Sequence, residues 1–86
     1  MQQQARTTNQ IGSIIRRVRR SKGLTQSELG EKVGLRQATI SRLEAGEPNT
    51  RIETLMDAMS ALGLEFLMRQ RTDGIADEPT SLEDWF

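Results

Sequence analysis

The chain has 86 residues with twelve Lys and Arg, twelve Asp and Glu, and neither cysteine nor histidine. This length allows one small domain with a modest core. Without thiolates and imidazoles the chain lacks the usual zinc ligands and the usual groups of nucleophilic triads, so we expect no metal, no cofactor and no enzymatic activity. It has no apolar run long enough to span a bilayer and no recognisable signal peptide, which predicts a cytoplasmic protein without membrane contact.

Capping signals divide residues 8–63 into four short helices. A threonine followed three residues later by Glu or Gln is typical of a helix start, and this spacing occurs at Thr7 and Gln10, Thr25 and Glu28, and Thr50 and Glu53. Glycine is the usual residue just after a helix, and it recurs at Gly23, Gly34, Gly46 and Gly63. These signals predict helices over residues 8–22, 26–33, 37–45 and 51–62.

Each predicted helix carries an apolar stripe at helical spacing. The stripes comprise Ile11, Ile14, Ile15, Val18, Leu29, Val33, Ile40, Leu43, Ile52, Leu55, Met56, Met59 and Leu62. We expect these side chains to form the core. The two middle helices are shorter than the roughly 12–15 residues that an isolated helix needs, so they must dock on the outer two.

The neutral overall balance conceals a strong segregation of charge. Residues 1–51 hold ten of the twelve basic residues and only four acids, whereas residues 52–86 hold two basic residues and eight acids. A cationic helical half can neutralise DNA phosphates, and an acidic end suits a protein partner better.

Residues 24–46 predict two short helices joined by a tight turn at Gly34, the second with a polar, cationic outer face. The segments Leu24–Leu29, Val33–Gly34 and Ile40–Gly46 resemble the Cro/C1-type helix-turn-helix domain of phage repressors and bacterial regulators. The resemblance covers residues 11–63. It implies an all-α, four- to five-helix, lambda-repressor-like domain over residues 8–63, preceded by an N-terminal arm over residues 1–7.

The same resemblance implies double-stranded operator DNA as a partner, with the second motif helix in the major groove. It makes Gln26 a phosphate contact and places Gln37 against bases. Chemistry agrees, because glutamine pairs with adenine, arginine with guanine, and an alanine methyl touches the thymine methyl, while hydroxyls suit phosphate and sugar. The predicted DNA-binding residues are Gln26, Ser27, Arg36, Gln37, Ala38, Thr39, Ser41, Arg42 and, from the first helix as a general electrostatic contact, Arg17.

After Gly63 the apolar period changes to two. Leu64, Phe66 and Met68 alternate, which predicts a short β-strand over residues 64–71. A lone strand needs a partner, and a second copy of the chain is the economical one, so these three residues are predicted to form a homodimer. Two half-sites about 34–36 Å apart then predict a pseudo-palindromic operator. The alternative is a strand folded back on its own helices.

Residues 72–86 are acidic and aperiodic, which predicts a flexible tail. The tail ends in Trp85 and Phe86, and large aromatic residues are typical anchors in protein interfaces. We therefore predict that these two residues bind a partner; the alternatives are that they fold back on the domain or are incidental.

The combination resembles the HipB-like antitoxins. The resemblance rests on Gln37–Ser41 after Gly34–Arg36, on the strand near residues 64–69 and on the Glu83–Trp85 ending, after which Phe86 is an addition. It implies a homodimeric repressor of its own operon that binds and neutralises a HipA-type serine/threonine kinase toxin. Two alternatives remain: a stand-alone phage- or XRE-type repressor without a toxin partner, and an adaptor that binds protein alone.

Overall fold

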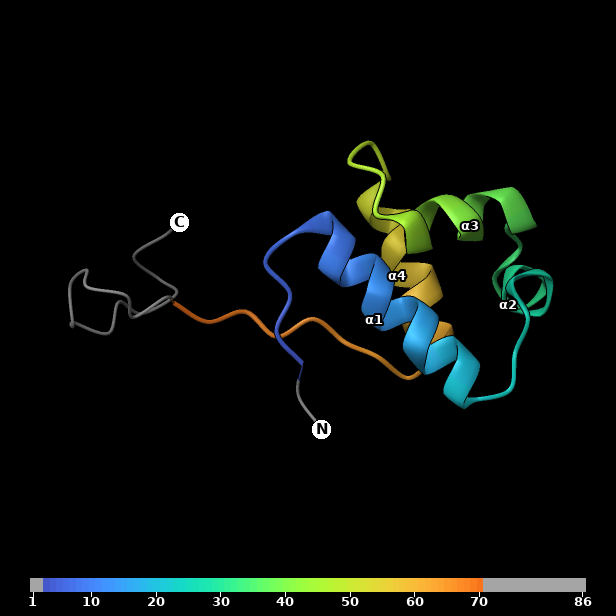
Figure 1. Ribbon diagram of the computed structural model, residues 1–86, viewed down its shortest axis with the longest axis horizontal. Helices are drawn as coiled ribbons and strands as arrows, with labels where there is room; N and C mark the ends of the chain where they lie inside the picture. Colours follow the sequence, from blue (N-terminus) through green and yellow to red (C-terminus); the bar gives the residue numbers. More distant parts are fainter. Residues whose placement is uncertain (1–2, 71–86) are drawn as a thin grey trace.

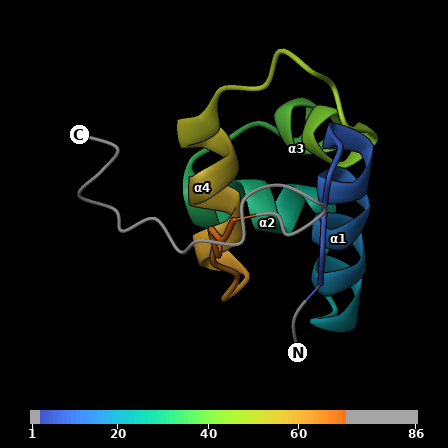
Figure 2. The ribbon, with the colours of Figure 1, turned by 90° about the vertical axis from the view of Figure 1, so that its left-hand side faces the viewer.

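The computed structural model describes residues 3–70, which form four helices joined by short loops (Figure 1). The helices are α1 (Thr8–Ser21), α2 (Gln26–Val33), α3 (Gln37–Ala45) and α4 (Ile52–Ala61). Every predicted boundary is confirmed to within one residue. α1 and α4 stand on opposite sides of α2, and α3 packs on both α1 and α2 (Figure 2). None of the helices within residues 3–70 could cross a membrane, because none is long and apolar enough.

The capping box at the start of α2 is confirmed in full. The backbone N–H of Glu28 donates to Thr25 Oγ1 at 3.0 Å, and the N–H of Thr25 donates to the Glu28 carboxylate at 2.8 Å. At α1 only half of the predicted box forms: the hydroxyl of Thr7 accepts from the N–H of Gln10 at 3.1 Å, but the Gln10 side chain accepts from the N–H of Arg6 instead. The complete capping box is therefore found at α2, the first helix of the motif.

The box predicted at Thr50 and Glu53 is wrong. The hydroxyl of Thr50 donates to the backbone carbonyl of Glu47 at 3.0 Å and so closes the preceding turn. α4 begins one residue later, with Arg51 as its N-cap and no hydrogen bond from that side chain to the helix. A serine or threonine can close a turn as readily as it caps a helix, and the sequence does not distinguish the two uses.

The core lies where the four helices meet, and most of the predicted stripe is confirmed. The buried residues of the core are Ile15, Leu29, Ile40, Leu43, Ala58, Met59 and Leu62. The prediction is wrong for Ile52 and Met56, which are 68% and 53% exposed. The side of α4 that faces the core carries Leu55 and Met59. Ile52 and Met56 lie on a neighbouring side of the same helix, which faces away from the core.

The crossing of α1 and α3 depends on Gly12, which is buried in α1. A Cβ atom on this residue would lie 2.5 Å from the carbonyl oxygen of Glu44 and 2.6 Å from that of Leu43. Both are backbone atoms of α3 and cannot move aside without moving the helix. The absence of a side chain at Gly12 therefore sets how closely the two helices approach.

We expect Gly12→Ala to lower the free energy of unfolding by about 1 kcal/mol, because overpacking of roughly 2 kcal/mol exceeds the helix propensity that alanine gains. Urea unfolding followed by circular dichroism measures the change. Ser13→Ala, at an exposed neighbour on α1, is the control. Equal stability of the two variants would show that the helices adjust at no cost.

Residues 64–70 leave the helices after α4 (Figure 1). The N–H of Leu64 donates to the carbonyl of Met59 at 2.8 Å, and the Leu64 side chain packs against the core of its own chain. Phe66 and Met68 are 45% and 93% exposed. No β-strand is present in the described part of this single chain. Strand pairing with a second chain, predicted over residues 64–71, stays a prediction; residue 71 and the tail with Trp85 and Phe86 lie outside the described residues.

Candidate DNA-binding surface

The turn between α2 and α3 holds the two helices of the motif at a fixed angle. Gly34 ends α2 with φ +71°, a left-handed conformation that glycine adopts without strain. The N–H of Leu35 then donates to the carbonyl of Gly30 at 2.8 Å. A Cβ on Gly30 would lie 2.5 Å from the carbonyl oxygen of Leu35, so the turn passes directly over this glycine. These contacts fix how α3 follows α2, and a hydrogen bond between the side chains of Gln37 and Gln26 joins the N-terminal ends of the two helices.

A buried ion pair joins α1 to α3 behind these helix ends. Arg19 Nε lies 2.5 Å from Glu44 Oε2, and Arg19 Nη2 lies 2.9 Å from Glu44 Oε1. The third side of the guanidinium donates to the carbonyl of Leu24 at 2.7 Å. Arg19 and Glu44 are each 6% exposed. Each follows a fully buried isoleucine, Ile15 or Ile40, by four residues, and that spacing is the sequence signal by which the pair could have been found.

Both groups of the pair are ionised at neutral pH. Burial alone raises the pKa of Glu44. The hydrogen bonds from Arg19 and Gln26 and the charges of Arg19 and Arg16 lower it by more than burial raises it, so the pKa lies below its ordinary value. The hydrogen bond to Glu44 raises the pKa of Arg19 by more than burial lowers it. Every buried polar side-chain atom within residues 3–70 has a hydrogen-bond partner. The pair is therefore fully satisfied, as a buried charge requires.

This arrangement predicts acid sensitivity. Because the pKa of Glu44 in the fold lies below its value in the unfolded chain, its contribution to stability is complete above the ordinary glutamate pKa of about 4.3 and is lost as the pH falls through the folded pKa. We expect the free energy of unfolding to be level between about pH 7 and pH 5.5 and to decline below about pH 4.3. Urea titrations across this range measure the slope.

Glu44→Gln removes this titration, so the free energy of unfolding should decline less steeply at acid pH in this variant than in the wild type. Glu31→Gln, at an exposed glutamate of α2, should leave the acid decline unchanged. Equal acid slopes for the wild type and Glu44→Gln would contradict the assignment.

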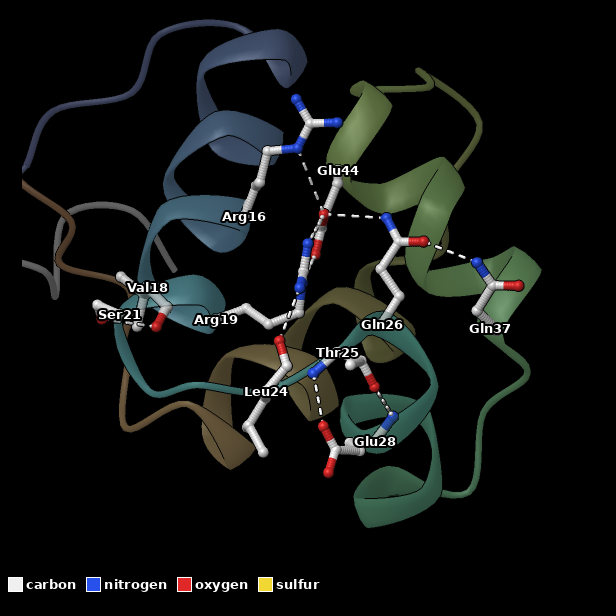
Figure 3. Close-up of polar contacts among 10 residues, drawn as sticks. All are labelled: Arg16, Val18, Arg19, Ser21, Leu24, Thr25, Gln26, Glu28, Gln37 and Glu44. Carbon is white, nitrogen blue, oxygen red and sulfur yellow. Dashed lines mark hydrogen bonds and ion pairs between the residues drawn. The ribbon is translucent and has the colours of Figure 1, made fainter.

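Glu44 also orders the polar side chains at the surface (Figure 3). Gln26 Nε2 donates to Glu44 Oε1 at 3.1 Å, and Gln37 Nε2 donates to Gln26 Oε1 at 2.8 Å. A carboxylate only accepts hydrogen bonds, so Gln26 must present its NH₂ group to Glu44 and its oxygen to Gln37. The order then requires Gln37 to present its NH₂ group to Gln26. One N–H and the carbonyl oxygen of Gln37 remain for a ligand.

A shallow hollow lies beside these two glutamines. Its lining comes from the end of α1 and the starts of α2 and α3: Arg19, Arg20, Gly23, Leu24, Thr25, Gln26, Ser27 and Gln37. Exposed Arg20 and the N-terminus of α2 give it positive potential, which suits a phosphate group. No three Asp or Glu residues of the described chain are grouped so that they could hold a metal ion.

The other predicted residues of the motif lie on α3 and just before it. Arg36 is the N-cap of α3, is exposed and makes no capping hydrogen bond with its side chain. Ala38, Ser41 and Arg42 are exposed, and Thr39 is half-buried. The outer side of α3 therefore offers a mixed set of hydroxyl, methyl and guanidinium groups next to Gln37.

Arg17 lies elsewhere. Arg17 Nη1 donates to Gln3 Oε1 of the N-terminal arm at 2.9 Å, and both residues line a different hollow beside α1. Arg16 instead reaches the polar network, with its Nε 3.7 Å from Glu44 Oε1 and its side chain 53% exposed. The sequence presents the arginines of α1 as one basic run; the structure separates a buried one, Arg19, from Arg16 and Arg17 on different sides.

From this placement we expect Arg16→Ala to weaken binding to all DNA sequences alike and to reduce the slope of log affinity against log salt by about 1. Arg17→Ala is the matched control, because it removes the same charge from the neighbouring position. Fluorescence anisotropy at several salt concentrations measures both slopes. A larger change for Arg17→Ala would instead support Arg17 as the general electrostatic contact, which stays a prediction from the sequence.

Comparison with known proteins agrees with this geometry. A family model described as helix-turn-helix matches residues 15–67. The antitoxin HipB of Escherichia coli K12 is 37% identical over 59 residues, which are 69% of this chain and 67% of that relative. In a solved HipA–HipB–O2–O3 complex, a chain that is 33% identical superposes with a TM-score of 0.75 over 80% of this chain and 97% of its own length. The chain belongs to the helix-turn-helix family of HipB-like antitoxins.

A bacterial regulator and a second HipB complex are also similar to this chain. An uncharacterised HTH-type transcriptional regulator of Sinorhizobium fredii, y4dJ, is 43% identical over 54 residues, 63% of this chain and 70% of the regulator. The HipB–O4 20mer complex contains a chain with 33% identity and a TM-score of 0.75, again over 80% and 97% of the two chains. The resemblances that the motifs predicted, to Cro/C1-type domains and to HipB-like antitoxins, are confirmed at the level of the family.

Proposed function

We propose that this HipB-like protein is a sequence-specific DNA-binding antitoxin that represses its own operon as a homodimer. One observation carries the proposal: the Gln26–Gln37 pair, tied to buried Glu44, stands where the first turns of α2 and α3 meet. It does so in a chain whose fold matches HipB in complexes named for O2, O3 and O4. We take these to be operator DNA duplexes.

In this proposal α3 enters the major groove. Gln37 reads a base edge, with Arg36, Ala38 and Arg42 beside it, while Gln26, Ser27, Thr39 and Ser41 contact phosphate or sugar and set the register. Arg20 and the N-terminus of α2 supply positive potential at the hollow.

The second half of the proposal is a HipA-type serine/threonine kinase toxin as protein partner. Its support is the likeness to the HipB chain of a HipA–HipB complex. Trp85 and Phe86 of the acidic tail are the residues we propose as the toxin-binding anchor, because large aromatic residues are typical anchors in protein interfaces. Binding there neutralises the kinase in the cytoplasm.

Two measurements test the two halves. Selection of bound duplexes from a random DNA library with the full chain should return a pseudo-palindrome whose half-sites lie one helical turn apart. Pull-down from the native cell should recover a kinase-like protein with the full chain and much less with the Trp85→Ala, Phe86→Ala double variant. Absence of any enriched sequence would contradict the DNA-binding half, and equal recovery would contradict the anchor.

A stand-alone repressor is the second candidate function. The observation in its favour is that the S. fredii regulator matches this chain over 54 residues at a higher identity than HipB does. Deletion of residues 72–86 separates the two functions. A stand-alone repressor keeps all its activity, whereas an antitoxin keeps DNA binding but loses affinity for the toxin.

A further inference from the structure

The polar network behind the proposed DNA-binding surface ends in a buried carboxylate. The side chain of Glu44 is only 1% exposed, so it lies too deep to touch a DNA base. Arg19 donates to both of its oxygens, and Gln26 donates to Oε1 as well. The Nε of Arg16 lies 3.7 Å from the same oxygen. Two guanidinium groups therefore keep Glu44 charged, and a charged carboxylate accepts hydrogen bonds but donates none.

Two glutamines carry this constraint from the interior to the surface (Figure 3). Gln26 lies between Glu44 and Gln37, at hydrogen-bond distances of 3.1 Å and 2.8 Å. A glutamine amide has a donor end, the NH₂ group, and an acceptor end, the carbonyl oxygen. Because Glu44 takes the donor end of Gln26, the acceptor end faces Gln37, which must donate in turn. The orientation of the exposed Gln37 amide therefore depends on a charge inside the domain.

We propose that Glu44 determines which base Gln37 prefers, although Glu44 does not touch DNA. This inference rests on the DNA-binding half of the proposed function and adds a positioning residue to it. In the observed orientation Gln37 keeps one N–H and its carbonyl oxygen, which match the N7 acceptor and the N6 donor of adenine. In the opposite orientation Gln37 would keep both N–H groups, which match the N7 and O6 acceptors of guanine.

The charge of Glu44 excludes the opposite orientation. The Glu44→Gln variant keeps the length of the side chain but replaces one oxygen by a donor. Arg19 makes its shorter contact to Oε2, at 2.5 Å from Nε against 2.9 Å from Nη2 to Oε1, so the remaining oxygen of the variant belongs on the Oε2 side. The new NH₂ group then faces Gln26, which must accept from it. Both glutamines of the relay reverse, and Gln37 is left with two free N–H groups.

A change at Gln26 reaches the same result without altering the buried ion pair. The ammonium group of lysine has three donors and no acceptor. In the Gln26→Lys variant it can donate both to Glu44 and to the carbonyl oxygen of Gln37, so Gln37 again keeps both N–H groups. Gln26 borders the shallow hollow, which leaves room for the longer side chain. Arg19 and Glu44 keep their mutual contacts in this variant, so the domain should remain folded.

The preference between two bases measures the effect separately from overall affinity. The base that Gln37 reads is located first, as the position at which Gln37→Ala removes a preference of the wild-type full chain. Anisotropy titrations then give the ratio of the dissociation constants for duplexes with guanine and with adenine at that position. The extra charge of Gln26→Lys acts on both duplexes alike, so it cancels in the ratio.

The wild type should bind the adenine duplex at least about tenfold more tightly than the guanine duplex. Glu44→Gln and Gln26→Lys should each reverse this order, so that the guanine duplex binds more tightly. The control is Glu31→Gln, which removes the same charge from an exposed position of α2 and should keep the wild-type ratio. Circular dichroism shows which variants have the helix content of the wild type.

A merely structural role of Glu44 gives a different result. A loosened site loses its discrimination between bases without gaining a preference for guanine. A ratio near one in a folded variant would therefore overturn the inference, and so would a retained preference for adenine in Glu44→Gln or Gln26→Lys. If Glu44→Gln does not fold, the ratio of Gln26→Lys decides alone.

Failure of the inference and failure of the proposed function are distinguishable. If the wild type selects a DNA sequence but Gln37→Ala changes no base preference, the DNA-binding proposal stands and the role of Glu44 is overturned. If the wild type selects no sequence, the DNA-binding half of the proposed function fails, and the inference fails with it.

Discussion

Glu44→Ala is expected to destabilise the domain by about 3–5 kcal/mol, because it leaves the guanidinium of Arg19 buried without its counter-charge. Arg19 is 6% exposed and has only the carbonyl of Leu24 as a remaining partner. Small domains are stable by roughly 5–15 kcal/mol, so a loss of this size brings the variant close to unfolding at physiological temperature. Urea unfolding followed by circular dichroism measures the change.

The control is Glu31→Ala, which removes an exposed glutamate from α2 and should change stability by less than about 0.5 kcal/mol. A second comparison separates the pair from its burial. The Arg19→Met, Glu44→Leu double variant removes both charges together and should recover most of the stability lost in Glu44→Ala, since no charge is left unpaired. If Glu44→Ala lowers the free energy of unfolding no more than Glu31→Ala does, then water solvates the Arg19 guanidinium in the variant and the ion pair does not hold α1 on α3.

The helix boundaries could be predicted because local chemistry determines them. The glycine at the end of α2 and the capping box at its start act within a single turn, so Thr25, Glu28 and Gly34 are visible as a pattern in the sequence. Thr50 shows the limit of such reasoning, because its hydroxyl has two local partners within reach and takes the one that closes the preceding turn.

Packing across helices was less predictable. Ile52 and Met56 match the helical period of a core stripe, but the period alone does not show which strip of α4 faces inward. Arg19 and Glu44 show the reverse error. Charged residues are expected at the surface, yet both of these are buried, because each neutralises the other across two helices.

The residues proposed to bind DNA include some that the sequence predicts and some that it does not. Gln26 and Gln37 follow from the motif, and the structure places them in contact. The four arginines of α1 cannot be ranked from sequence, because their roles depend on which neighbours α3 and the N-terminal arm provide. The strand predicted over residues 64–71 is a third case, because its pairing requires a second chain and stays a prediction in this single chain.

Gln37→Ala is expected to cost about 1–3 kcal/mol of affinity for the specific site, with the loss concentrated at one base position. The reason lies in the order of donors along Glu44, Gln26 and Gln37. With one N–H of Gln37 donated to Gln26, the remaining N–H and the carbonyl oxygen match the N7 acceptor and the N6 donor of adenine. Anisotropy titrations of the selected duplex, of its single-base variants and of a scrambled duplex measure the loss.

The wild type should therefore lose affinity when the adenine read by Gln37 is replaced, and Gln37→Ala should become indifferent to that replacement. Affinity for the scrambled duplex should be unchanged, because the side chain contributes no charge to phosphate binding. Gln26→Ala is the informative companion. It frees the Gln37 amide to rotate, so the preference at the same base should weaken even though Gln37 is present. Equal losses on specific and scrambled duplexes for Gln37→Ala would remove Gln37 from base reading and leave it as a backbone contact.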